Sequence, residues 1–117
     1  MKLLKDYQVL SLVRRLRPVI EKDHTWRNDA ACLEEDPELF FPIGTTGPAI
    51  GQAQNAREVC DGCDVEAKCL VWALTQNINE GVWGGTTEAE RRALKRRMKR
   101  ARDTEDATRK MESLGVN

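Results

Sequence analysis

The sequence predicts an all-α fold, a small bundle of about four short helices that depends on a chemical crosslink. Apolar residues recur at helical spacing in separate segments of the 117 residues, and no alternation of strands with helices is visible. Only 40% of the residues are hydrophobic and 5% are aromatic, so the core is thin. Four cysteines are present, and small domains with thin cores commonly rely on disulfides or metal sites.

The first predicted element is an N-terminal amphipathic arm over residues 1–23. Apolar side chains recur from Val9 to Ile20 with arginines between them, and Pro18 is expected to end or kink the helix. We expect a loosely attached helix or a partly disordered extension, with a docking or self-association surface as the alternative. The segment lacks the features of a secretory signal, so a cytoplasmic protein with reduced cysteines is expected.

Residues 24–86 are predicted to form the core. Pro48 suits the first position of a helix that ends at Cys60, with Gly62 in the left-handed conformation just beyond. Cys32 should lie in a loop or at a helix end, because prolines punctuate the residues after it.

A turn must separate Cys63 from Cys69. Six steps along one continuous helix would rotate the second thiol about 240° away from the first. We therefore expect the chain to break between Gly62 and Asp64, with Asp64 as the N-cap of the next helix.

The sequence GVWGG at residues 81–85 predicts a tight turn. Gly81, Gly84 and Gly85 would let backbone approach backbone closely, and Trp83 would be buried.

A basic helix is predicted over residues 87–102, followed by a flexible tail over 103–117. Thr87 and Glu90 form a capping-box signature at its start. Although the formal net charge is zero, residues 91–117 carry 10 basic and 4 acidic side chains, which makes nucleic acid the first candidate partner. The predicted phosphate contacts are Arg91, Arg92, Lys95, Arg96, Arg97, Lys99, Arg100 and Arg102.

The four cysteines point to a metal or cluster site whose type their spacing leaves open. Structural zinc sites commonly use two C-x-x-C pairs or a mixture with histidine, but Cys60 and Cys63 form the only such pair and His24 stands alone. Iron-sulfur clusters tolerate a compact run with one distant thiolate, which favours a cluster modestly. A thiol-disulfide oxidoreductase is a third possibility, but it would require a βαβ context.

Taken together, the four cysteines, the GVWGG turn and the basic helix resemble the WhiB-like iron-sulfur transcriptional regulators of bacteria and some phages, from about Trp26 to Arg102. The strings DPELFFP at 36–42 and GPA at 47–49 resemble the short WhiB1-type branch. Asp64 stands where that family often has proline, and the arm has no counterpart in its shortest members.

The resemblance implies one 4Fe-4S cluster held by Cys32, Cys60, Cys63 and Cys69, with the helices wrapped around it. It implies nitric oxide or oxygen as cluster-reactive signals, and the C-terminal region of the primary sigma factor as a partner. On this match Trp26, Phe40, Phe41 and Trp83 would lie at or beside the sigma-factor contact, and core packing is their alternative role. No nucleophile with a base partner and no phosphate-cradling loop is seen, so no enzymatic turnover is expected.

Overall fold

The computed structural model describes residues 5–44 and 46–115. Among these residues there are four α-helices and three short 3-10 helices, and the only strand-like feature is an isolated bridge between Trp83 and Thr86. The all-α prediction is confirmed. The elements in order are α1 (Asp6–Lys22), η1 (Thr25–Asp29), η2 (Ala31–Glu34), η3 (Pro37–Phe40), α2 (Pro48–Asp61), α3 (Glu66–Thr75) and α4 (Glu88–Ser113).

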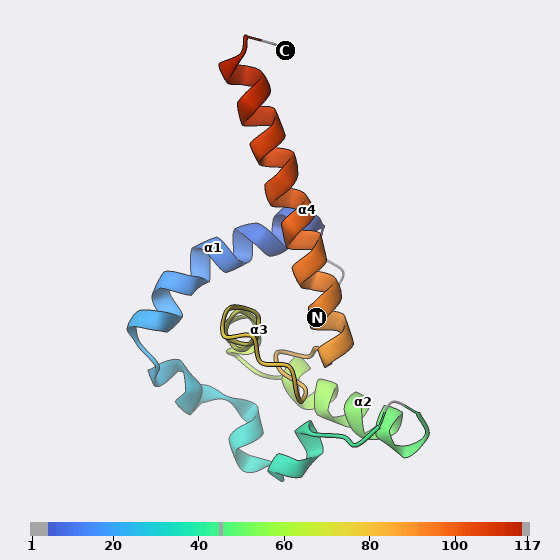
Figure 1. The fold of residues 1–117 in the computed structure, drawn as a ribbon. Helices are drawn as coiled ribbons and strands as arrows, with labels where there is room; N and C mark the ends of the chain where they lie inside the picture. Colours follow the sequence, from blue (N-terminus) through green and yellow to red (C-terminus); the bar gives the residue numbers. More distant parts are fainter. Residues whose placement is uncertain (1–4, 45, 116–117) are drawn as a thin grey trace.

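The helix α1 packs into the main core, with its side chains against α3 and α4 (Figure 1). Val9 and Ile20 are fully buried, and Leu10 and Val13 are nearly so, because three- and four-residue spacing places all of them on one helix face. The expected loose attachment is therefore wrong for the described part of the arm. Residues 1–4 lie outside the described residues.

Pro18 does not end the first helix, which continues to Lys22. The proline removes one backbone hydrogen bond, but it lies on the exposed face. Burial of Ile20 in the following turn stabilises the helix beyond it.

Replacing Ile20 with alanine is expected to cost about 2–4 kcal/mol of unfolding free energy, because the side chain is fully buried between helices. Chemical denaturation followed by circular dichroism measures this change in the free energy of unfolding. Val19→Ala is the matched control, since Val19 is 50% exposed and should change stability by less than about 0.5 kcal/mol. Equal, negligible effects of the two substitutions would mean that α1 is not part of the cooperative core.

Ion pairs fix the crossing of α1 and α4. The carboxylate of Asp6 accepts hydrogen bonds from Arg97 at 2.8 Å and Arg100 at 3.3 Å, and Arg14 donates two to Glu105, each of 2.9 Å. The bond from Arg97 lowers the pKa of Asp6, and the bond from Arg14 lowers that of Glu105. Both carboxylates are thus held charged next to the basic helix.

A second, smaller apolar cluster forms where α2 meets η3. It contains Phe40, Ala56, Cys60 and Val82, whereas the main cluster contains the buried residues of α1, α3 and α4. Cys63 and Cys69 pack against the main cluster. The cysteines therefore lie where the two apolar clusters meet.

The connection from α2 to α3 differs from the prediction in two details. Gly62 has a φ of −90°, so it is not left-handed, and the N-cap position of α3 is Val65 without a side-chain cap. Two consecutive turns replace the predicted cap. The N–H of Cys63 donates to the carbonyl oxygen of Cys60, and the N–H of Glu66 donates to the carbonyl oxygen of Cys63. The predicted break between Cys63 and Cys69 is present.

The helix α4 is longer than predicted. Its capping box is confirmed, since the Thr87 N–H donates to Glu90 at 2.9 Å and the Glu90 N–H donates to the Thr87 hydroxyl at 3.4 Å. The expected flexible tail is instead helical to Ser113, where pairs such as Lys99–Asp103 support it. The molecule is 56 Å long because α4 projects beyond the body (Figure 1). No helix in the described ranges is long and apolar enough to cross a membrane.

Candidate cluster site and basic helix

The four cysteines line one cavity of about 330 Å³. Cys32 lies in η2, Cys60 near the end of α2, Cys63 in the turn that follows and Cys69 in α3. All are free thiols. Residues separated by up to 37 positions in the chain are thus brought to one cavity by η2, α2 and α3.

Burial favours the protonated thiol at three of the four cysteines. Desolvation raises the pKa of Cys32 and Cys60, and it raises that of Cys69 to about 12. Metal binding to thiolates must therefore displace protons at neutral pH.

Backbone N–H groups face the sulfur atoms and favour the thiolate forms. The N–H of Ala31 donates to the Cys63 sulfur at 3.4 Å. The backbone N–H groups of Gly85 and Gly84 oppose the burial effect on the pKa of Cys60 and Cys69, respectively. Four thiols with amide donors around them are a donor set that suits an iron-sulfur cluster.

Within the described residues, no group of three or more His, Cys, Asp or Glu side chains is close enough to hold a metal ion. The four cysteines line one cavity, so binding of a zinc ion or of a cluster would draw their sulfur atoms together.

The glycine loop, residues 81–86, closes one side of the cavity. Gly81, Gly84 and Gly85 have positive φ angles of 86°, 55° and 74°, as the predicted turn requires. A Cβ atom on Gly84 would lie 2.7 Å from the backbone nitrogen of Leu70 in α3. Val82 and Thr86 are the buried side chains of the loop, whereas Trp83 is half-buried, which corrects its predicted burial.

The predicted sigma-factor residues divide into two buried and two accessible side chains. Trp26 and Phe40 are each only 7% exposed and pack into the main and second apolar clusters, respectively. Phe41 is 47% exposed and lines the cysteine cavity together with Trp83. Of the two adjacent phenylalanines, Phe40 thus points inward and Phe41 points outward.

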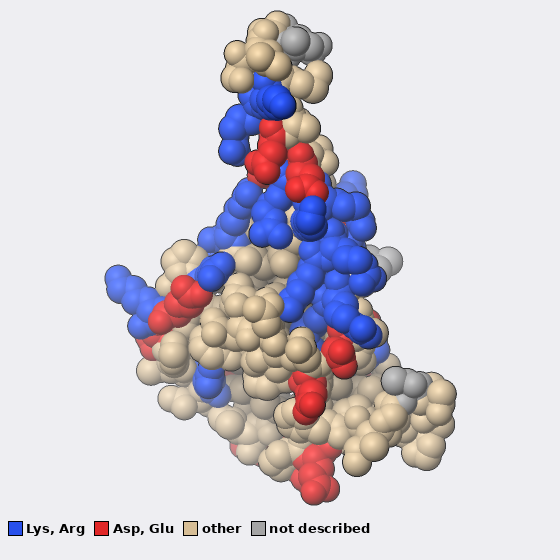
Figure 2. All heavy atoms as spheres, viewed as in Figure 1, with Lys and Arg blue, Asp and Glu red and all other residues tan. Residues whose placement is uncertain are grey.

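Lysine and arginine side chains gather along α4 (Figure 2). Arg92, Arg96, Lys99, Arg100 and Arg102 are exposed. Lys95 donates to Asn77, and Arg97 is paired with Asp6 and partly covered.

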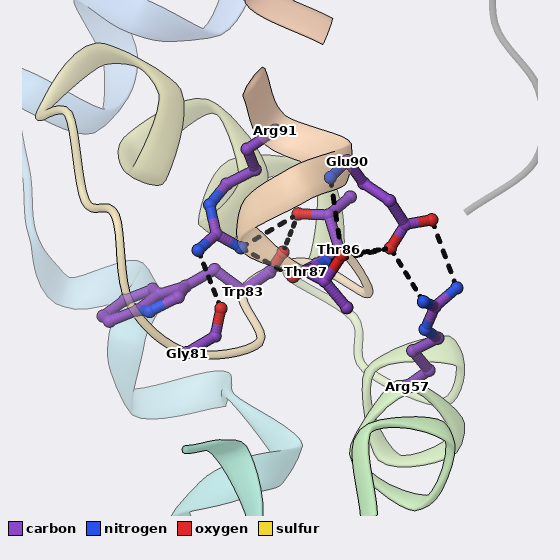
Figure 3. A network of polar contacts seen from close by, with 7 residues as sticks. All are labelled: Arg57, Gly81, Trp83, Thr86, Thr87, Glu90 and Arg91. Carbon is purple, nitrogen blue, oxygen red and sulfur yellow. Dashed lines mark hydrogen bonds and ion pairs between the residues drawn. The ribbon is translucent and has the colours of Figure 1, made fainter. Parts of the chain in front are cut away.

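Arg91 does not belong to this exposed set, because it is only 2% exposed. It donates to the carbonyl oxygens of Thr86 at 2.6 Å, Gly81 at 2.7 Å and Ile78 at 3.3 Å (Figure 3). The prediction that it contacts phosphates is therefore wrong. Its charge stabilises the glycine loop. The sequence does not reveal this role, because seven similar basic residues follow Arg91 up to Arg102.

The sequence interpretation also missed two exposed apolar side chains beside this site. Leu33 is 64% exposed and lines the cysteine cavity, and Ile43 is 95% exposed next to the Phe40–Phe41 pair. The available signal was position, since Leu33 directly follows Cys32 and Ile43 follows the string FFP at 40–42.

Comparisons with known proteins agree with these features. The family model described as "Transcription factor WhiB" matches residues 26–94. The chain is 54% identical over 77 residues to "Transcriptional regulator WhiB1" of Mycobacterium tuberculosis (strain ATCC 25618 / H37Rv), covering 66% of this chain and 92% of that protein. It is 57% identical over 77 residues to WhiB1 of Bifidobacterium longum (strain NCC 2705), covering 66% and 84%. Identity to M. tuberculosis WhiB2 (strain ATCC 25618 / H37Rv) is 41% over 76 residues, covering 65% and 80%.

The family match begins at Trp26 and therefore omits α1, but it includes all four cysteines, the glycine loop and the start of α4. The resemblance to the WhiB1-type branch is supported by the high identity to two WhiB1 proteins. The chain belongs to the WhiB family of transcription factors.

Proposed function

We propose that this WhiB-family regulator binds one 4Fe-4S cluster through Cys32, Cys60, Cys63 and Cys69. The observation that supports the proposal is that four free thiols from separate elements line one cavity. Such a cluster supplies a crosslink among these elements and a centre that reacts with nitric oxide or oxygen. The proposed location is the cytoplasm, and the proposed role is regulatory rather than enzymatic.

The crosslink would stabilise the fold between its two apolar clusters. Cys60 belongs to the apolar cluster around α2, whereas Cys63 and Cys69 pack against the cluster around α3. Ligation by all of these cysteines joins two small apolar clusters. Folding and cluster binding should therefore be coupled.

Anaerobic purification tests this proposal. The protein should be brown, with charge-transfer absorbance and about four iron and four sulfide ions per chain. Colourless protein with stoichiometric zinc would instead support a zinc-stapled DNA-binding or adaptor module. Disulfide reduction that depends on Cys60 and Cys63 would support a thiol-disulfide oxidoreductase.

The proposed partner is the C-terminal region of the primary sigma factor. Phe41 and Trp83 offer an accessible aromatic surface at the cysteine cavity, and the buried Phe40 lines the same cavity. Trp26 is buried in the main apolar cluster. Exposed aromatic side chains at the centre of an apolar patch commonly dominate binding energy.

Replacing Phe41 with alanine is expected to weaken binding of the sigma-factor region about tenfold or more, because it removes the more exposed of the two aromatic anchors. Calorimetric titration of the cluster-loaded protein measures the affinity. Leu114→Ala is the control, since Leu114 is 69% exposed at the far end of the molecule. Unchanged affinity of the Phe41 variant would place the contact elsewhere.

The proposed DNA contact is made by the exposed basic side chains of α4 from Arg92 to Arg102. Their dense spacing suits phosphates and gives no basis for base recognition. Arg96 and Arg102 are exposed, and both lie in the part of α4 between residues 91 and 102 where basic residues are dense in the sequence.

The logarithm of DNA affinity is expected to fall with the logarithm of salt concentration with a slope of about −3 to −4. Arg96→Gln should reduce that slope by about 1, because one phosphate contact is lost. Fluorescence anisotropy over a salt series measures both values. Arg109→Gln, on the projecting part of α4, is the control. A salt-independent affinity would contradict a phosphate contact.

A further inference from the structure

Arg91 spans the space between the glycine loop and the first turn of α4 (Figure 3). All three guanidinium nitrogens donate, at 2.6–3.3 Å, to the carbonyl oxygens of Ile78, Gly81 and Thr86. The Thr86 hydroxyl accepts a further bond from Arg91 at 3.3 Å and donates to Trp83 at 2.6 Å. One buried side chain therefore holds both ends of the loop.

The same loop faces two of the proposed cluster ligands. Gly84 lines the same cavity as Cys60 and Cys69, and its backbone packs closely against Leu70, the residue that follows Cys69. The backbone N–H groups of Gly84 and Gly85 hydrogen-bond to Cys69 and Cys60, respectively. The glycine loop thus lies between Arg91 and the thiols. The planar guanidinium group of Arg91 holds in place the loop amides that face the sulfur atoms.

Arg91 also belongs to α4. It follows directly on the capping box of Thr87 and Glu90, and Glu90 is paired with Arg57 of α2 at 2.9 Å. The loop that faces the thiols and the start of the basic helix are therefore held by adjacent residues of one helix turn.

We infer that Arg91 is a positioning residue that holds the amides of the glycine loop against Cys60 and Cys69 and joins these thiolates to the start of α4. The inference rests on the proposed cluster. Amides that face the sulfurs stabilise the more negative, reduced cluster. Loosening them makes the reduction potential more negative and opens the loop and the first turn of α4.

The test uses anaerobically purified wild-type protein and the variants Arg91→Met, Arg91→Lys and Arg109→Met. Iron and sulfide are counted first, and the reduction potential and the amide hydrogen exchange of residues 81–94 are then measured. Arg91→Met should have a more negative potential and about tenfold faster exchange in this segment, since several buried hydrogen bonds are lost. Arg91→Lys keeps the charge without the fork, so it should give intermediate values.

Arg109→Met removes an exposed arginine from the same helix and should match the wild type in both measurements. A cluster-bearing Arg91→Met protein with wild-type potential and exchange would overturn the inference. If that variant does not fold, Arg91→Lys decides in the same way. Wild-type protein without iron would instead overturn the proposed function itself.

Discussion

Cys69→Ser is expected to remove the cluster and to lower the free energy of unfolding by about 3 kcal/mol or more. Cys69 lies on α3, packs against the main apolar cluster and lines the cavity with the other three cysteines. A serine hydroxyl is a poor ligand for iron, so three thiolates would have to hold the cluster alone. The joint between the two apolar clusters would then be lost.

Visible absorbance, iron and sulfide content, and denaturation of anaerobically prepared protein measure these effects. Glu35→Gln is a matched control, because Glu35 lines the same cavity but offers no thiolate. It should retain full cluster content and stability. A Cys69→Ser protein with an equally stable, complete cluster would refute the assignment of Cys69 as a ligand.

Gly84→Ala is the second substitution with a large expected effect, with a cost of about 3 kcal/mol or more. An alanine Cβ would lie 2.6 Å from the Leu70 Cβ, 2.7 Å from the Leu70 nitrogen and 2.8 Å from the Glu66 oxygen. Two of these atoms are backbone of α3 and cannot move separately from the helix. The φ of +55° adds strain for any residue with a side chain.

Gly51→Ala is the opposite case and serves as the control. Gly51 lies within α2, and a Cβ atom there meets nothing within 4 Å. Alanine should stabilise the helix by about 0.5–1 kcal/mol. Urea denaturation of both variants measures the difference, and a Gly84→Ala protein as stable as the wild type would show that the loop does not pack against α3 as described.

Local signals in the sequence predicted much of the fold correctly. The Thr87–Glu90 capping box, Pro48 at a helix start and the break after Cys63 all depend on residues within a few positions of each other. The expected convergence of four cysteines follows from the same local breaks, and the structure brings all four to one cavity. The assignment of the cluster and of the sigma-factor and DNA contacts stays a prediction.

The attachment of α1 concerns contacts between segments distant in the chain. A loosely attached α1 was expected because its own apolar face gives no indication of the partners it finds on α3 and α4. Trp26 and Phe40 were predicted to lie at or beside a partner surface, with core packing as the alternative, and each packs into one of the two apolar clusters.

The sequence by itself determined the helical class, the family resemblance and the four thiols, because composition, helix punctuation and residue spacing are local properties. Tertiary structure alone decided which basic residue is buried. Eight similar cations lie between residues 91 and 102 of α4, and only the approach of residues 78–86 places three carbonyl groups around Arg91 and leaves Arg96 in solvent. A buried charge is stable only where such partners surround it, and that depends on the folded chain.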